Sequence, residues 1–326
     1  MFDKGYEVRK DPLSDIVEQQ GAVVLDGGLA TLLEARGHKL DPHLWSAKML
    51  IDSPDEIRVA HRLFLDAGAD CVTTATYQAS YEGFARLGLG PSDVDKLLTL
   101  SVTLAQDAVN EFQSDAPRVN HRPSPLVGAS IGPYGAFLAD GSEYDGRYGV
   151  SSEGLTHFHD RRFTCLATAG VDLMAFETIP SLNEARVLLD LLGKSAELWG
   201  WMSFSCRDGG HLSDGTSIET AVELCNSAEN LVGVGVNCTA PRFVSELIGR
   251  IRPKTDKLVL VYPNSGESWD AVEKQWNRSD FQEDWVDLAE QWHKAGAEVI
   301  GGCCKIGPDI IKQTRGRIIT GPTEGI

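Results

Sequence analysis

The sequence comprises 326 residues, with a formal net charge of −17 and a pI near 4.9. Surfaces that bind nucleic acid or anionic membranes carry clustered Lys and Arg, so this acidic composition argues against both partners. Hydrophobic residues make up 42% and charged residues 24%, which is ordinary for a packed core. Residues 1–10 lack the apolar core of a signal peptide, and no run approaches the roughly 18 apolar residues of a membrane span, so we expect a cytoplasmic protein.

Apolar runs that alternate with helical patterns predict the secondary structure. A short helix at 15–20 comes first and is expected to cover the floor of a barrel. Strands are predicted at 22–26, 70–75, 126–131, 173–177, 198–204, 231–236, 258–262 and 299–301, and helices at 29–36, 54–67, 92–113, 151–169, 181–193, 217–227, 241–250, 281–295 and 308–315. Eight such alternations indicate an α/β fold, a (β/α)₈ TIM barrel with a short N-terminal helix. We expect one domain over 1–326, with its core at about 20–315.

Three predicted connections are longer than the loops that usually join barrel elements. The segment 114–124 lies on the helix-to-strand side and is interpreted as an insertion. The segments 132–151 and 263–280 follow the third and seventh strands. Both are therefore expected over the rim formed by the carboxyl ends of the strands, where lids and substrate contacts belong.

Cysteines follow two of the predicted strands. Cys238 ends the motif Gly235-Val-Asn-Cys238 after the sixth strand, and Cys303 and Cys304 follow Gly301-Gly302 after the eighth. Both strand ends open onto one rim, and glycine permits the unusual backbone that turns neighbouring side chains toward one point. Three thiolates and a vacant fourth position are typical of a catalytic zinc site. A disulfide between the two adjacent cysteines is the competing interpretation, although seven cysteines, an odd number, fit reduced thiols or metal ligation better.

The thiolate ligands also indicate which substrate such a zinc ion would activate. Three negative ligands make zinc a poor activator of water, whereas a coordinated thiol loses its proton and stays nucleophilic. The expected substrate is therefore a thiol, and its partner is an electrophilic alkyl donor. The histidines show no metal-ligand spacing, and no Gly-x-Gly-x-x-Gly follows a strand, so a dinucleotide-binding fold has no support.

Carboxylates end two further strands of the predicted barrel. Asp26 and Glu177 close the first and fourth strands, so both are expected to point into the mouth and to hold a substrate ammonium as a pair. Two carboxylates on a barrel rim are also the signature of a glycosidase, with Glu177 and Glu267 as the acid/base pair. The cysteine triplet makes this second interpretation less attractive.

Polar and aromatic residues near the same rim complete the candidate site. Thr76 and Tyr77, at the end of the second strand, are expected to hydrogen-bond a substrate head group, with a structural role equally open. Trp45 either faces a sulfonium through a cation–π contact or plugs the rim as a loop aromatic.

Eight short motifs are spread along the chain from about residue 20 to 315. They are Val24-Leu-Asp-Gly-Gly28, Leu44-Trp-Ser-Ala47, Thr76-Tyr-Gln-Ala79, Ala139-Asp-Gly-Ser-Glu-Tyr144, Phe176-Glu-Thr178, Gly235-Val-Asn-Cys238, Val261-Tyr-Pro-Asn-Ser-Gly-Glu267 and Gly301-Gly-Cys-Cys304. In this order they resemble the motifs of the homocysteine S-methyltransferase family. So many motifs in register make the similarity specific, and it is closest to the S-methylmethionine-dependent enzymes.

The resemblance implies a (β/α)₈ barrel that binds Zn²⁺ through three cysteines, with the homocysteine thiol as a further ligand. It also implies that two carboxylates hold the homocysteine amino group and that nearby backbone groups seat the amino acid. The implied site residues are Cys238, Cys303 and Cys304 for the metal, and Asp26, Gly27, Thr76, Tyr77 and Glu177 for the substrate. We add Trp45 and Asn237 to the candidate substrate residues. The chain departs from the family at Lys305 and Ile306, where members commonly have Arg and Thr.

The hypothesis that follows is transfer of a methyl group from a sulfonium donor to homocysteine, which forms methionine. Similarity favours S-methylmethionine as the methyl donor. S-adenosylmethionine or a betaine-like compound stays open as the donor, and selenohomocysteine or selenocysteine stays open as the acceptor. From other classes, a glycoside hydrolase and a non-catalytic zinc- or thiol-binding barrel stay as alternatives. We expect a monomer or a small homo-oligomer.

Overall fold

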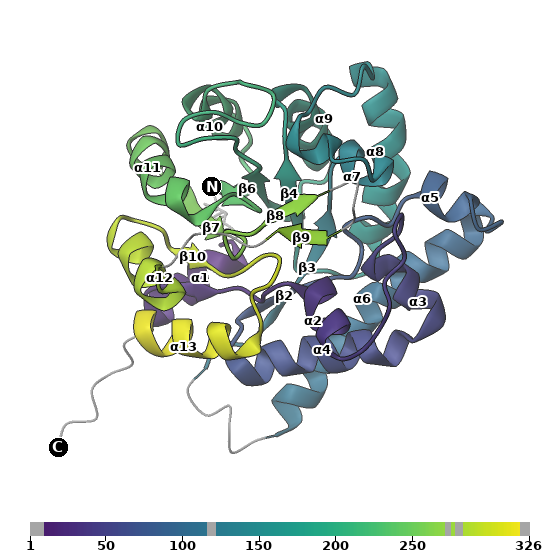
Figure 1. The fold of residues 1–326 in the computed structure, drawn as a ribbon, viewed down its shortest axis with the longest axis horizontal. Coiled ribbons are helices and arrows are strands. Elements are labelled where there is room, and N and C mark those ends of the chain that lie inside the picture. The colour runs from purple at the N-terminus through teal and green to yellow at the C-terminus, as the bar shows by residue number, and fades with distance from the viewer. Residues whose placement is uncertain (1–9, 116–121, 271–274, 278–282, 320–326) are drawn as a thin grey trace, which may run out of the picture.

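The computed structural model describes residues 10–115, 122–270, 275–277 and 283–319 (Figure 1). Its main sheet has eight parallel strands in the order β1-β10-β7-β6-β5-β4-β3-β2. These strands are β1 (Val23–Val24), β2 (Cys71–Thr73), β3 (Leu126–Ile131), β4 (Leu173–Ile179), β5 (Trp199–Phe204), β6 (Leu231–Asn237), β7 (Leu258–Tyr262) and β10 (Val299–Ile300). The two ends of this order meet, because Leu25 bridges Cys71 in parallel and the Asp70 amide donates to the Val24 carbonyl at 2.6 Å. The sheet is therefore a barrel.

Helices form an outer ring around these strands (Figure 1). The longer ones are α4 (Pro54–Ala67), α6 (Pro91–Ser114), α8 (Ser152–Thr168), α9 (Leu182–Leu192), α10 (Ile218–Asn226), α11 (Pro241–Ile251), α12 (Trp285–Lys294) and α13 (Pro308–Ile318). Several begin where the sequence supplies a cap: Ser151, Ser181 and Ser217 each accept a hydrogen bond from a first-turn amide. Helix α4 ends at Gly68, whose φ of 113° requires glycine and turns the chain into β2.

The N-terminal helix α1 (Pro12–Gln20) closes one end of the barrel. Its Leu13 and Ile16 are buried in the same apolar cluster as inward-facing strand residues such as Trp201 and Leu260. The predicted helix over the barrel floor is thus confirmed, and the opposite end, where the strands finish, stays available for a site.

All eight predicted strands and the helices between them are present, with ends shifted by a few residues. The prediction missed short elements: α3 (Met49–Asp52), α5 (Tyr81–Ala85), α7 (Tyr134–Leu138) and the antiparallel pair β8 (Ser268–Asp270) with β9 (Gln275–Asn277). Helices of four or five residues show no amphipathic period, which explains the omission of the first three. Parts of the predicted connections 114–124 and 263–280, and the start of the helix predicted at 281–295, lie outside the described residues.

No helix in the described part of the chain combines the length and the apolar character that crossing a membrane requires.

Candidate active site

One cavity opens at the carboxyl ends of the barrel strands. Its empty space, counted out to the open mouth, is about 810 Å³. The polar residues that line it are Asp26, Thr31, Ser46, Thr73, Thr74, Ser130, Glu143, Glu177, Thr178 and Asn237, and the aromatic and sulfur-bearing ones are Trp45, Tyr77, Tyr144, Tyr262, Cys238, Cys303 and Cys304. The structure thus brings most of the predicted site residues to one place.

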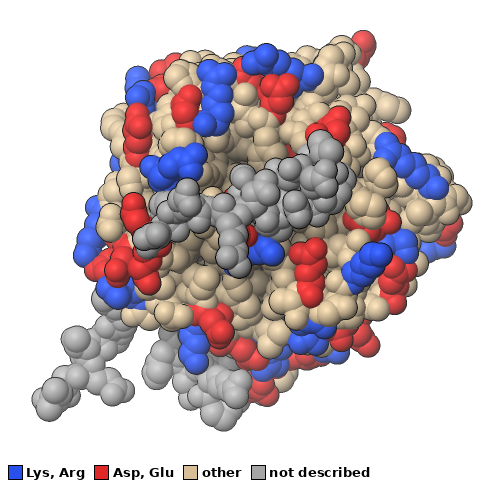
Figure 2. All heavy atoms as spheres, in the orientation of Figure 1, with Lys and Arg blue, Asp and Glu red and all other residues tan. Residues whose placement is uncertain are grey.

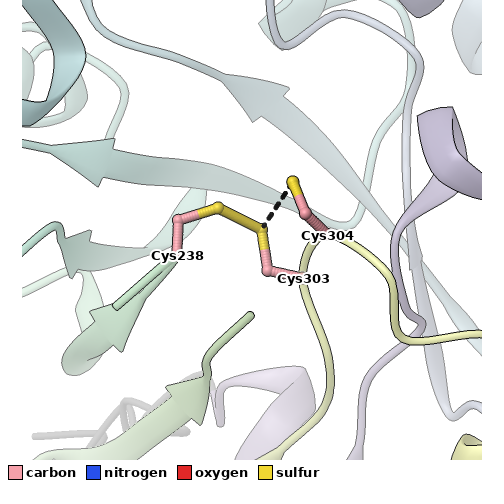
Figure 3. A group of neighbouring side chains, drawn as sticks. All are labelled: Cys238, Cys303 and Cys304. Atoms are coloured by element: carbon pink, nitrogen blue, oxygen red, sulfur yellow. Dashed lines mark hydrogen bonds between the residues drawn. A yellow bond between two sulfur atoms is a disulfide. The ribbon is translucent and has the colours of Figure 1, made fainter. Parts of the chain in front are cut away.

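The three cysteines converge at one side of this cavity. Cys238 directly follows β6, Cys303 and Cys304 lie in the loop after β10, and their sulfur atoms point toward one another (Figure 3). All three Sγ atoms lie within 4.8 Å of one another. Cys238 and Cys303 are joined in a disulfide, whereas Cys304 keeps a free, buried thiol. The adjacent pair does not form the disulfide considered from the sequence.

The backbone that orients these thiols differs from the one the sequence suggested. Gly301 and Gly302 have no positive φ, and the left-handed residues are Cys238 itself, with φ of 45°, and Lys305 directly after Cys304, with φ of 70°. Glycine is needed in the loop for a different reason, since a Cβ on Gly302 would lie 2.1 Å from the Ile306 side chain and one on Gly301 2.5 Å from the Leu25 side chain. The loop therefore approaches β1 closely, and this close packing places Cys303 and Cys304 opposite Cys238.

The spacing of the two adjacent cysteines fits a tetrahedral metal ion. Two thiolates bound to one zinc ion at about 2.3 Å each would lie about 3.8 Å apart, and the Cys303 and Cys304 sulfurs are 3.9 Å apart. Reduction of the disulfide would turn all three residues into thiolate donors on one face of the cavity. The donor set, three sulfurs with open space on the remaining side, is that of a metal site with a vacant position for a substrate.

Asp26 is the first of two buried carboxylates beside the cysteines. Only 4% of its surface is exposed, and it accepts hydrogen bonds from the Thr73 amide at 2.8 Å and the Thr73 hydroxyl at 3.3 Å. Burial raises the pKa of Asp26 well above its usual value, and the nearby charge of Glu177 adds to that effect. Thr73, which the sequence analysis did not single out, therefore fixes the orientation of this carboxylate.

Glu177 is the second carboxylate, and a break in strand pairing turns it into the cavity. The register between β4 and β5 shifts between Phe176 and Ile179, and Thr178 has φ of 60°, which is unusual for a β-branched residue. Asn237 holds this conformation, because its Oδ1 accepts from the Thr178 amide at 2.6 Å and its Nδ2 donates to the Thr178 hydroxyl at 2.8 Å. The Asn237 amide is thus engaged with protein groups, although the residue lines the cavity.

The surroundings of Glu177 set its protonation. Its carboxylate accepts hydrogen bonds from the Ser130 hydroxyl and the Tyr262 hydroxyl. Burial nevertheless dominates and raises the pKa of Glu177 to about 7. Ser130 is a second residue that the sequence analysis missed, and the signal for it was a polar side chain at the end of an apolar strand, 126–131.

Some of the other predicted substrate residues line the cavity, and some do not. Gly27, Trp45 and Tyr77 line the cavity, and a Cβ on Gly27 would lie 2.2 Å from the Ile306 carbonyl oxygen. Thr76 is fully buried outside the lining, where its hydroxyl donates to the Ser130 carbonyl at 2.6 Å. Glu267, the partner in the glycosidase alternative, does not line the cavity either.

A segment between β3 and α8 supplies further lining residues that were not predicted. Glu143 and Tyr144 belong to the short 3₁₀ helix η3 (Ser142–Tyr144) in the predicted rim connection 132–151. Glu143 is 8% exposed, the same fraction as Glu177 and close to the 4% of Asp26. The sequence analysis includes both residues in the motif Ala139-Asp-Gly-Ser-Glu-Tyr144 and assigns neither of them a role.

Comparison with known proteins identifies the family. A family model described as homocysteine S-methyltransferase matches residues 23–318 of this chain. The chain belongs to the homocysteine S-methyltransferase family. Members of this family transfer a methyl group to the sulfur of homocysteine, which forms methionine. This membership bears out the resemblance seen in the motifs, and it decides against the glycosidase alternative.

Individual relatives cover almost the whole chain. Homocysteine S-methyltransferase YbgG of Bacillus subtilis is 42% identical over 93% of this chain and 96% of its own length. A selenocysteine Se-methyltransferase of Brassica oleracea is also 42% identical, over 93% of this chain and 90% of its own length. Crystal structures of the homocysteine methyltransferase MmuM of Escherichia coli, in a metallated and in an oxidised form, match with a TM-score of 0.85 and 38% identity, over 94% of this chain and 100% of MmuM.

Proposed function

We propose that this protein transfers a methyl group from S-methylmethionine to homocysteine at a zinc ion held by Cys238, Cys303 and Cys304. The convergence of three thiols beside two buried carboxylates carries the proposal. The similarity to a metallated homocysteine methyltransferase supports a metal at the cysteines. The acidic lining supports a cationic donor.

The cysteine cluster and the carboxylates have separate tasks. When bound, zinc would lower the pKa of the substrate thiol and leave its sulfur nucleophilic. Asp26 and Glu177 would receive the α-ammonium of homocysteine, which places the substrate sulfur toward the cysteine side of the cavity. Thr73 and Ser130 hold the two carboxylates in position for this contact.

The chemical step then needs alignment rather than acid or base catalysis. The substrate thiolate attacks the methyl carbon of the sulfonium in line with the bond that breaks. The electron pair of that bond goes to the donor sulfur, which leaves neutral, so no general acid is required. Holding both substrates in line supplies roughly 7–11 kcal/mol of the barrier.

A donor panel tests this proposal. The reduced, zinc-loaded protein is incubated with homocysteine and S-methylmethionine, S-adenosylmethionine or glycine betaine, and methionine is quantified. We expect the highest kcat/KM with S-methylmethionine. Retention of zinc without methionine formation from any donor would contradict the proposal and leave a binding protein.

Selenocysteine is a second candidate acceptor, because a selenocysteine Se-methyltransferase is 42% identical to this chain. The same panel with selenocysteine in place of homocysteine compares the two acceptors. A higher kcat/KM for selenocysteine would replace homocysteine as the preferred substrate and leave the donor assignment intact.

A further inference from the structure

The cavity is lined by one sign of charge. On the face shown in Figure 2, Lys and Arg lie among Asp and Glu. Among the described residues that line the cavity there are three carboxylates, Asp26, Glu143 and Glu177, and no Lys, Arg or His. Two of these carboxylates are assigned above to the ammonium of homocysteine. The third, Glu143, comes from a different element and has no role in that assignment.

The backbone around Glu143 is tightly fixed. Its carbonyl accepts a hydrogen bond from the Ser205 hydroxyl at 3.0 Å. A Cβ on Gly135 would lie 2.4 Å from the Glu143 nitrogen, so the 3₁₀ helix packs directly against α7. Burial raises the pKa of Tyr77, and the charge of Glu143 is a second, smaller cause of that rise. Glu143 and Tyr77 thus face the same part of the cavity.

A buried polar network anchors both ends of the segment that carries Glu143. The Glu184 carboxylate accepts from the Tyr134 amide at 2.6 Å and from the Tyr148 hydroxyl at 3.0 Å, so one residue holds the start and the end of the segment. His159 Nε2 lies 2.8 Å from Glu184, and its Nδ1 lies 2.9 Å from Arg162 Nη2. All three charged or titratable groups are almost fully buried. The carboxylate of Glu143 is therefore presented by a preorganised segment.

The chemistry decides which cation suits such a carboxylate. A sulfonium loses its charge as the methyl group leaves, so a carboxylate against it would stabilise the substrate more than the transition state. An ammonium elsewhere on the donor keeps its charge throughout the reaction. A fixed carboxylate that binds this ammonium improves affinity without slowing the chemical step.

We propose that Glu143 binds the α-ammonium of the methyl donor, so that the site selects sulfonium donors that are also amino acids. The proposal rests on the function proposed above, because it assigns Asp26 and Glu177 to the other substrate. S-methylmethionine and S-adenosylmethionine both carry this ammonium, whereas glycine betaine and simple sulfonium acids do not.

The test combines a protein variant with a donor analogue. S-methylmethionine is compared with the dimethylsulfonium acid of the same chain length that lacks the amino group, on the zinc-loaded wild type and on Glu143→Gln. Glu153→Gln serves as control, because Glu153 is an exposed carboxylate in the first turn of α8. Steady-state kinetics give KM for each substrate, and calorimetry without homocysteine gives donor affinity without turnover.

For Glu143→Gln we expect the KM and Kd for S-methylmethionine to rise by about 10- to 100-fold, the effect of losing one charge-assisted hydrogen bond. The kcat and the KM for homocysteine should change less than threefold. The analogue should bind the wild type weakly, and its affinity should be the same in the variant. Glu153→Gln should match the wild type in every measurement.

Two results would overturn the inference while methionine is still formed. One is an unchanged donor KM, or a change in homocysteine KM instead, in Glu143→Gln. The other is equal affinity of the wild type for S-methylmethionine and for its analogue, a comparison that needs no variant and so stands even if Glu143→Gln does not fold. Failure of the wild type to form methionine from any donor would instead sink the proposed function.

Discussion

Two buried aspartates at opposite ends of the barrel show how differently this fold treats a carboxylate. Asp70 precedes β2 and is fully buried, and Asp26 follows β1 and is 4% exposed. Asp70 accepts hydrogen bonds from Arg315 at 2.7 Å and from Gln20 at 2.6 Å, with Arg122 at 3.5 Å. Among the described residues, the Asp26 carboxylate accepts hydrogen bonds from the amide and hydroxyl of Thr73 and from its own backbone amide, and the charge nearest to it is the carboxylate of Glu177.

The difference follows from what each end of the barrel does. At the end where strands begin, the negative charge is compensated within the protein, which links α1, α13 and β2. At the end where the strands finish, no Lys, Arg or His among the described residues lines the cavity, and in the proposed function the substrate ammonium supplies the compensating charge. An uncompensated buried charge costs stability in the free protein, and an incoming ammonium recovers that cost as binding free energy.

The largest effect is expected when a cysteine at the rim is replaced, and a cysteine in the core serves as the comparison. We expect Cys303→Ala to lose the metal and to reduce kcat/KM by well over the roughly 10–100-fold that loss of an outer-shell partner causes. Cys225→Ala, which alters a fully buried thiol of α10, should keep both metal and activity. Metal analysis and methionine formation check both variants. Equal metal content in the two variants would contradict the assignment of Cys303 as a metal ligand.

Asp70→Asn tests the compensated end. Removing this carboxylate leaves two guanidinium groups without their buried partner, which should lower the free energy of unfolding by about 3 kcal/mol. The estimate lies at the lower end for a buried pair, because the side chains of Arg122 and Arg315 are 17% and 16% exposed. Denaturant unfolding measures the loss, and KM for homocysteine should not change. A raised KM with unchanged stability would reverse the comparison.

Asp26→Asn tests the end that is left to the ligand. Loss of the charge that we propose receives the homocysteine ammonium should raise KM for homocysteine by about 10- to 100-fold. Because burial raises the pKa of Asp26, the charged form is unfavourable in the free protein, so the variant should be no less stable than the wild type at pH 8. Kinetics, metal content and unfolding are measured together. Loss of metal in this variant would count against the assignment.

The pH dependence of homocysteine affinity is the smallest expected effect. Burial raises the pKa of Glu177 to about 7, so below that pH the carboxyl must lose a proton before it can pair with an ammonium. Protonation of Glu177 should therefore weaken homocysteine binding by about tenfold as the pH falls from 8 to 6. The matched Glu177→Gln protein should lack this part of the dependence. Calorimetric Kd values for both proteins give the comparison, and identical slopes would contradict it.

The sequence was sufficient for the barrel and for the sulfur cluster, because both follow from local pattern. Apolar strands separated by capped helices predict the fold, and residues that directly follow parallel strands lie together at the carboxyl end of the barrel. The roles of Thr73 and Ser130 were not predictable, since each depends on the register between neighbouring strands. Glu143 was missed because a loop places it, and no periodicity relates the position of a residue in a long loop to the cavity.

The central claim is that the three cysteines hold a metal whose remaining position takes the homocysteine sulfur. X-ray absorption at the zinc edge measures this directly on the reduced, zinc-loaded protein. We predict three sulfur ligands and one lighter ligand without substrate, and four sulfur ligands after homocysteine is added. A ligand set that stays the same when homocysteine binds would contradict the account.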